Sequence, residues 1–210
     1  MLRVVNLDDN KESALELKAL QTLALRNVWL ELIDPTDEEL HATAEKTGVP
    51  KSFLELPETD GGWVNLRLEQ EFGIINFVIL QDIIATKEVH PIVMAFSKTF
   101  LVTVSKGADQ GIIKIAKERM SKAKVDPPSQ VSYFIIDEIV SAHFVQLERL
   151  EDLTSTLEEE VVEKTSSDTL KQIFSLKSNL VSLNKTLWYE RGLIFNLRKC
   201  GDTCMAAKAR

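Results

Sequence analysis

This chain lacks the sequence features that mark secreted proteins, membrane-spanning proteins and several classes of enzyme. It opens without the roughly 7–15-residue apolar segment of a signal peptide, and no later run reaches the ~18 uninterrupted apolar residues of a membrane-spanning helix. No strained-serine elbow, glycine-rich phosphate loop or paired-histidine zinc motif is present either. We therefore expect a chain that is soluble as it stands, that is not an enzyme and that has no catalytic residue.

Cysteine and histidine are scarce. Cys200 and Cys204 have no second cysteine pair or histidine cluster to complete a tetrahedral zinc site, so we interpret them as free thiols of a reducing compartment. The three histidines, His41, His90 and His143, fall in unrelated segments. We interpret His143 as a packing or surface residue of a helix rather than as a metal ligand.

Positive charge is in deficit. The 25 Lys and Arg residues face 32 Asp and Glu residues, which gives a formal net charge of -7 over 210 residues. Nucleic acids and anionic membranes are bound through a basic face that neutralises phosphates, so this balance disfavours nonspecific binding to either. Divalent cations and basic partners suit the chain better.

The first 126 residues carry alternating strand and helix signals. We expect strands over 2–7 and 28–33, with a helix over 13–22 between them. Thr36 and Glu39 form the capping-box pattern of a helix that Gly48 ends.

Four strand candidates follow, and their short connections predict antiparallel neighbours; they cover 63–69, 73–84, 89–96 and 99–105. The apolar run within 73–84 predicts a central strand that is covered on both faces. A helix over 108–124 ends this part, with Lys117 on its outer side. The predicted class is α/β (α+β), with a mixed, largely antiparallel sheet between helical layers over 1–126.

Residues 127–199 change to unbroken helical periodicity and predict a long antiparallel helical hairpin. The first helix runs for about 35 residues from Ser129, with a seam spaced by three and four that is apolar except at Gln146. Residues 165–168 supply a short reversal with N-cap chemistry. Residues 200–210 are interpreted as a C-terminal tail or as the start of a truncated stalk. We expect the hairpin to reach past the compact part before it.

The second helix of the hairpin has an unusually broad apolar face. Two adjacent rows repeat every seven residues, one formed by Ile173, Leu180, Leu187 and Ile194 and the other by Phe174, Val181, Trp188 and Phe195. A two-helix seam needs only a narrow stripe, so another element must cover the rest of this face.

Acidic residues gather on the hairpin and at two apolar sites. The hairpin set consists of Glu148, Glu151, Asp152, Glu158, Glu159, Glu160 and Glu163. It fits either a surface that concentrates hydrated divalent cations or a solvated face that keeps the hairpin soluble. Glu55 and Asp137 lie in apolar runs, where a carboxylate needs a metal or a hydrogen-bonding partner.

The order of these segments resembles the cytoplasmic domain of the CorA family of divalent-cation transporters. Segments similar to that family include Val28-Trp29-Leu30-Glu31-Leu32, Gly48-Val49-Pro50 with Leu54-Glu55, and Lys98 to Val104. The most telling match joins Leu157-Glu158-Glu159-Glu160-Val161 to residues 176–181 and 187–191. Each motif is short, and their order and spacing through nearly the whole chain carry the resemblance.

The resemblance implies a funnel-shaped cytosolic α/β/α domain with its hairpin beside a central stalk helix. It also implies a homopentamer at the cytoplasmic face of the cell (inner) membrane, attached through a stalk and membrane helices that would follow residue 210. Cytosolic Mg²⁺ would bridge acidic residues between subunits and hold the pore shut. Glu55 and Asp137 fall on acidic positions of that regulatory region, whereas Leu56 stands where the family pattern has an aspartate.

Three functions follow from these observations. The leading one is a regulatory, ion-sensing domain of a magnesium transporter, with Co²⁺ and Ni²⁺ as further candidate ions. A domain of a CorA-related zinc transporter, with Zn²⁺ as its ion, is the nearest alternative. The third is a soluble helical-hairpin scaffold that binds another protein through the broad apolar face.

Overall fold

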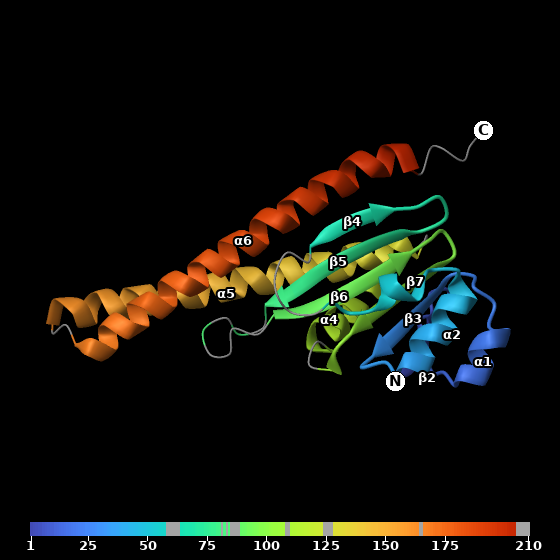
Figure 1. The fold of residues 1–210 in the computed structure, drawn as a ribbon, viewed down its shortest axis with the longest axis horizontal. Helices are drawn as coiled ribbons and strands as arrows, with labels where there is room; N and C mark the ends of the chain where they lie inside the picture. The colour runs from blue at the N-terminus through green and yellow to red at the C-terminus, as the bar shows by residue number, and fades with distance from the viewer. Residues whose placement is uncertain are drawn as a thin grey trace. The chain divides into compact units, whose positions relative to one another are not determined.

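The fold is described from a computed structural model of the chain (Figure 1). The described residues are 1–57, 64–80, 82, 84, 89–107, 110–123, 128–163 and 166–204; within them, the side chains of residues 89, 110, 163 and 200–204 are left out. The sequence Thr59-Asp60-Gly61-Gly62 predicts a turn, and both that turn and the predicted domain boundary at 126 lie outside the described residues.

The chain forms two compact units. The first contains Met1–Ile79 and His90–Ile139, and the second contains Leu80–Val89 and Val140–Arg210. The division into domains at 1–126, 127–199 and 200–210 stays a prediction. Among the described residues, no helix combines the length and the apolarity needed to cross a membrane.

A seven-stranded sheet organises the first unit, in the order β2-β1-β3-β7-β6-β5-β4. Its strands are β1 (Leu2–Asn6), β2 (Lys11–Ala14), β3 (Val28–Ile33), β4 (Asn65–Leu68), β5 (Gly73–Leu80), β6 (Val89–Phe96) and β7 (Phe100–Ser105). β3 and β7 pair in parallel, while β1 with β2, β1 with β3, β4 with β5 and β6 with β7 are antiparallel. The predicted mixed, largely antiparallel sheet is confirmed.

The interior of the sheet follows the predicted burial. Every residue of β5 is buried except Asn76, which is half-buried. Both faces of this strand are therefore covered, as its continuous apolar sequence indicates. β5 nevertheless lies one strand from the edge, because β4 pairs with its outer side.

The helix predicted over 13–22 is wrong in its first half. Lys11–Ala14 forms the exposed edge strand β2, and only Leu17–Thr22 is helical, as α1. Asn10, with φ 55°, makes the turn that returns the chain along β1. Pairing with β2 satisfies the backbone hydrogen-bonding groups along the edge of β1. A short polar strand has no alternation of apolar residues, so its sequence does not predict it.

Helices lie on both faces of the sheet. α1, α2 (Asp37–Thr47) and α3 (Lys51–Leu54) contribute to an apolar cluster with Leu30 and Leu32 of β3. The alternate β3 residues, Trp29 and Glu31, contact Lys117 of α4 (Gln110–Met120) instead. Because side chains alternate across a strand, α4 covers the opposite face. The predicted sheet between helical layers is confirmed.

The capping box predicted for α2 is also present. Thr36 Oγ1 accepts a hydrogen bond from the Glu39 backbone N–H, and the Glu39 carboxylate accepts one from the Thr36 N–H. Gly48 ends the helix in the left-handed region, at φ 74°, where glycine carries no steric cost.

α5 (Ser129–Glu163) and α6 (Ser167–Cys204) are the two predicted long helices, and they lie side by side in Figure 1. They run antiparallel, since His143 contacts Glu190 while Glu160 contacts Thr169 close to the turn. Ser166 caps α6 by accepting the Thr169 N–H at 3.0 Å. The leucines of the seam form an apolar cluster that includes Leu150, Leu157, Leu176 and Leu183.

Candidate functional site

Glu55 occupies the end of α3 in the first unit. Its side chain is 52% exposed, and its Oε1 lies 3.6 Å from Nζ of Lys51. Lys51 also binds Asp37, and the hydrogen bond to Asp37, supported by the charges of Asp37 and Glu55, raises the pKa of the lysine. The apolar sequence around Glu55 suggested burial, which is wrong: the neighbouring apolar side chains turn inward, and the carboxylate remains open to solvent.

Asp137 lies on the part of α5 that belongs to the first unit. Its Oδ2 lies 2.6 Å from a guanidinium nitrogen of Arg119, and its side chain is 38% exposed. Arg119 also binds Glu138 at 3.0 Å. The hydrogen bond to Asp137, followed by the one to Glu138, raises the pKa of Arg119. Asp137 thus has the partner that its apolar neighbourhood requires, and that partner is basic.

Glu55 also lines a cleft of about 1150 Å³ in the first unit. Asp34, Arg67 and Lys106 line the same cleft, so its walls carry charges of both signs. Among the described residues, no three histidine, cysteine, aspartate or glutamate side chains lie close enough together to hold a metal ion. Within the described part of one chain, the carboxylates are therefore separate.

The acidic surface of the hairpin is exposed as predicted. Six of its seven residues are exposed, namely Glu148, Glu151, Asp152, Glu158, Glu159 and Glu160, and the side chain of Glu163 lies outside the described residues. Glu160 accepts a 3.5 Å hydrogen bond from Thr169. This surface is open to mobile cations, and its local charge is strongly negative.

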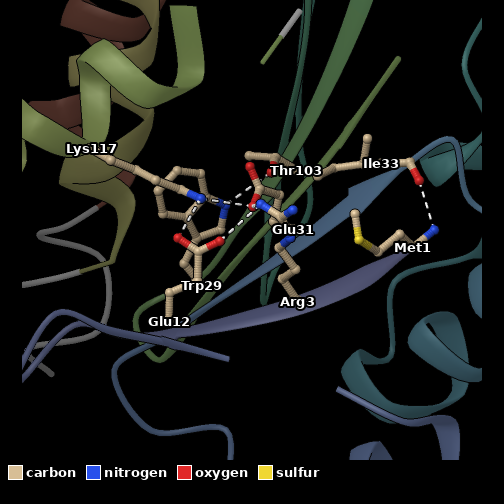
Figure 2. Close-up of polar contacts among 8 residues, drawn as sticks. All are labelled: Met1, Arg3, Glu12, Trp29, Glu31, Ile33, Thr103 and Lys117. Atoms are coloured by element: carbon tan, nitrogen blue, oxygen red, sulfur yellow. Dashed lines mark hydrogen bonds and ion pairs between the residues drawn. The ribbon is translucent and has the colours of Figure 1, made fainter. Parts of the chain in front are cut away.

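A cluster of paired charges joins α4 to the sheet (Figure 2). Glu31 on β3 is fully buried, and its Oε2 lies 2.8 Å from Nζ of Lys117 and 4.0 Å from Arg3. Lys117 also binds Glu12 at 3.0 Å and lies 5.1 Å from the centroid of the Trp29 ring. The prediction that Lys117 faces outward is wrong, because the buried carboxylate draws its ammonium group inward.

The charges of this cluster balance. Arg3 and Lys117 face Glu12 and Glu31, so two cations match two carboxylates. Burial raises the pKa of the Glu12 carboxyl, but hydrogen bonds and charge from Lys117 and Arg3 outweigh it, and the net shift lowers the pKa. The cluster has no excess negative charge to attract a cation. Its geometry indicates a fixed anchor between helix and sheet.

A second buried polar group lies in the hairpin. His143 and Glu190 are 1% and 2% exposed, and His143 Nδ1 lies 3.1 Å from Glu190 Oε2. His143 Nε2 accepts the backbone N–H of Leu80 at 3.3 Å. Because Nε2 accepts a hydrogen bond, Nδ1 carries the ring hydrogen and donates a hydrogen bond to Glu190 Oε2. The interpretation of His143 as a packing residue agrees with this burial.

The sequence did not identify the carboxylates of Glu31 and Glu190 as buried groups that pair with distant side chains. Glu31 interrupts an otherwise apolar strand, and Glu190 interrupts an apolar row of α6. Those interruptions were the available signals. The partners, Lys117 and His143, lie 86 and 47 residues away along the chain and could not be chosen by spacing.

The broad apolar face of α6 is exposed in the described chain. The exposed fractions are 70% for Phe174, 62% for Val181, 64% for Trp188 and 56% for Phe195. Large apolar patches on a protein surface mark interaction sites. The prediction that the hairpin seam alone cannot cover this face is confirmed.

Comparison with known proteins matches most of this chain to one family. A family model described as "CorA-like Mg2+ transporter protein" matches residues 25–204, which reach from the residues just before β3 to the end of α6. The cobalt/magnesium transport protein CorA of Thermotoga maritima is 42% identical over 65 residues. That alignment covers 31% of this chain and 18% of the relative, so the chain matches only a small part of that protein's length.

Two solved structures share the fold. The soluble domain of CorA from Methanocaldococcus jannaschii has a TM-score of 0.71 at 16% identity, covering 93% of this chain and 78% of that one. The ZntB cytoplasmic domain from Vibrio parahaemolyticus has a TM-score of 0.67 at 13% identity, covering 99% of this chain and 82% of that one.

Proposed function

This chain belongs to the family of CorA-like Mg²⁺ transporter proteins, and from that premise we propose that it is a cytoplasmic regulatory domain that senses divalent cations and controls a pore. The observation that carries the proposal is the extent of the family match, which includes strands β3 to β7 and both helices of the hairpin. The proposal includes a homopentamer at the cytoplasmic face of the membrane, with Mg²⁺ as the regulatory ion.

Glu55 and Asp137 support a regulatory site because they are accessible and their present partners can be exchanged. Each carboxylate pairs with a flexible basic side chain at a partly exposed position. Such pairs contribute little stability, so a divalent cation can compete with the lysine or arginine. Since Glu55 and Asp137 are not part of a three-ligand group among the described residues, we propose that the ion is held between carboxylates of neighbouring copies.

The ligand chemistry favours Mg²⁺ over Zn²⁺. Carboxylate oxygens suit Mg²⁺, which retains several of its waters, whereas zinc sites are usually built from histidine and cysteine. The proposed residues supply only oxygen ligands. The second candidate is a domain of a CorA-related zinc transporter, with Zn²⁺ in place of Mg²⁺.

The test is the thermal midpoint of the chain with and without millimolar Mg²⁺. A ligand at about ten times its dissociation constant stabilises the form that binds it by about 1.4 kcal/mol, which corresponds to a few degrees. We expect Glu55→Ala with Asp137→Ala to abolish most of this shift. Arg119→Ala frees Asp137 from its competitor and should enlarge it.

The matched control removes the other acids bound to the same basic residues. Asp37→Ala with Glu138→Ala changes the net charge equally and deprives Lys51 and Arg119 of one partner each. This control should keep the Mg²⁺ shift. A shift that survives in Glu55→Ala with Asp137→Ala removes those residues from the proposal, and a larger shift with Zn²⁺ than with Mg²⁺ favours the second candidate.

A further inference from the structure

His143 makes one hydrogen bond through each nitrogen of its buried ring. Nε2 accepts the Leu80 backbone N–H at 3.3 Å, and Nδ1 donates to Glu190 Oε2 at 3.1 Å. Leu80 is the last residue of β5, while His143 lies on α5 and Glu190 on α6. All three residues belong to the second unit. One imidazole therefore connects three segments that are distant in the sequence.

The pair of His143 and Glu190 carries one net negative charge when the ring is neutral. Residues three and four positions away share the inward face of each helix, and those at 139, 140, 146, 147, 186, 187, 193 and 194 are uncharged. Arg191, which follows Glu190, is exposed. On the β5 side, Asp82 lies 4.0 Å from Arg149, which offsets its charge. None of these groups places a cation against the buried carboxylate.

A single added proton removes this net charge, and two atoms are available to take it. On Nε2 of His143, the proton creates an imidazolium whose charge matches that of the Glu190 carboxylate. On Oε1 of Glu190, it creates a buried hydroxyl, and this atom has no hydrogen-bond partner among the described residues. Burying an unsatisfied donor is costly. The geometry therefore favours Nε2 as the site of protonation.

Nε2 cannot hold a proton and accept the Leu80 N–H at the same time. An imidazolium has a donor at each nitrogen and no acceptor. Two N–H groups would then face each other across the 3.3 Å that now separates the two nitrogens. The Leu80 amide must move away and bond to water instead, whereas the ring keeps its contact with Glu190.

We propose that His143 is a proton-sensitive latch, in which a proton and the Leu80 N–H compete for Nε2. At high pH the neutral ring holds Leu80, and as the pH falls the imidazolium releases Leu80 and binds Glu190 more tightly. Histidine is the side chain that changes its charge between about pH 5 and pH 8. β4 pairs with β5 from Gly73 to Asn76, so Leu80 lies beyond that pairing. This latch goes beyond the proposed ion sensing, because it makes the hairpin respond to protons.

Nuclear magnetic resonance of the full chain reports the state of Nε2 directly. The nitrogen chemical shifts of a histidine ring distinguish a neutral ring with its hydrogen on Nδ1 from an imidazolium. We expect His143 to show the first form at about pH 8 and the second at about pH 5. The signals that disappear in His143→Gln assign this ring. A ring that keeps its neutral form at the lower pH would overturn the proposal.

Hydrogen exchange of the Leu80 amide reports the release. Exchange is compared as a protection factor, which removes the intrinsic effect of pH on amide exchange. We expect the protection of Leu80 to fall by about tenfold from the higher to the lower pH, because a buried hydrogen bond is lost. The amide of Leu30, within β3 of the first unit, is the reference and should keep its protection. Constant protection of Leu80 while Nε2 gains a proton would contradict the latch.

Two amide variants separate the roles of the ring and the carboxylate. Glutamine offers one acceptor and a donor group without titrating, so His143→Gln can keep both contacts, and the protection of Leu80 should no longer depend on pH. Glu190→Gln removes the negative charge that favours the imidazolium, so release should require a lower pH. The wild-type chain and Glu190→Gln decide the question even if His143→Gln does not fold.

His41→Gln is the matched control. His41 lies on α2 with a 67% exposed side chain, and its Nε2 lies 3.3 Å from Glu45 Oε1. It is a second pair of histidine and glutamate, but one that is open to solvent. This control should leave the pH dependence of Leu80 protection unchanged. An equal effect of His41→Gln, or a pH dependence that survives in His143→Gln, would overturn the latch.

The outcome is separable from that of the proposed ion sensing. Glu55 and Asp137 belong to the first unit, and the Mg²⁺ shift is measured at constant pH. A preserved Mg²⁺ shift without release of Leu80 overturns only the latch. Release of Leu80 without a Mg²⁺ shift overturns only the sensing proposal.

Discussion

The two units bury their ionisable groups in different ways. In the first unit, Glu31 meets Lys117 and lies near Arg3, so cationic partners neutralise the buried carboxylate. In the second unit, the buried Glu190 accepts one hydrogen bond from the His143 ring. In both units the second carboxylate oxygen, Oε1 of Glu31 and of Glu190, has no hydrogen-bond partner among the described residues. The difference shows that the sheet uses a full ion pair as an anchor, whereas the hairpin uses a weaker polar contact within an apolar seam.

The largest effect is expected from breaking the ion pair between Lys117 and the buried Glu31. Lys117→Ala leaves Glu31 buried without its closest cation and should lower the free energy of unfolding by about 3–5 kcal/mol. Urea denaturation measures this loss. Lys114→Ala, an exposed lysine on the same helix, serves as the control and should change stability by less than about 0.5 kcal/mol. A small loss from Lys117→Ala would show that solvent reaches Glu31.

The hairpin should tolerate loss of its polar pair better than the sheet does. Glu190→Ala leaves the His143 Nδ1–H unsatisfied and should cost about 2–3 kcal/mol in urea denaturation. Replacing both partners, with His143→Leu and Glu190→Leu, should recover most of that loss, because a buried polar pair can be exchanged for well-packed apolar side chains. Asn184→Ala on the exposed side of α6 is the control. Failure of the double replacement to recover stability would mean that the pair fixes the helix register.

Helix caps provide a third comparison between the units. Thr36→Ala removes one half of a capping box in the first unit and should cost about 1–2 kcal/mol, whereas Ser166→Ala in the hairpin should cost about 0.5–1 kcal/mol. Thermal unfolding distinguishes the two. Thr36→Ser keeps the accepting oxygen and should retain most of the stability. Equal losses at the two sites would show that the reciprocal hydrogen bond to the Glu39 carboxylate does not reinforce the Thr36 cap.

The smallest effect concerns acid sensitivity. The folded-state pKa of Glu12 lies below its ordinary value of 4.5, so its stabilisation is present above pH 4.5 and is lost as the pH falls through the folded pKa. Because the side chain is 36% exposed, its contribution should be below about 1 kcal/mol. Glu12→Gln should therefore differ from wild type at neutral pH and converge with it in acid. Denaturation at several pH values measures that convergence, and a constant difference would contradict it.

Local sequence signals predicted those parts of the fold that depend on neighbouring residues. Thr36 with Glu39 located a helix start, Gly48 located its end, and the repeat from Ile173 to Phe195 located an exposed apolar face. The strand β2 escaped prediction because its polar residues gain their conformation from pairing with β1. Glu55 was expected to be buried, since an apolar segment does not reveal which side of a short helix its acid will face.

The sequence by itself determined the long hairpin, its charge pattern and the predominance of antiparallel strands, because helical periodicity and short connections act over a few residues. Only the tertiary structure decided that Lys117 turns inward to Glu31 and that His143 meets Glu190. Those pairs form between distant segments, where the cost of burying a charge is offset by one particular partner. No local pattern encodes that choice, because packing of the surrounding sheet and helices brings the partners together.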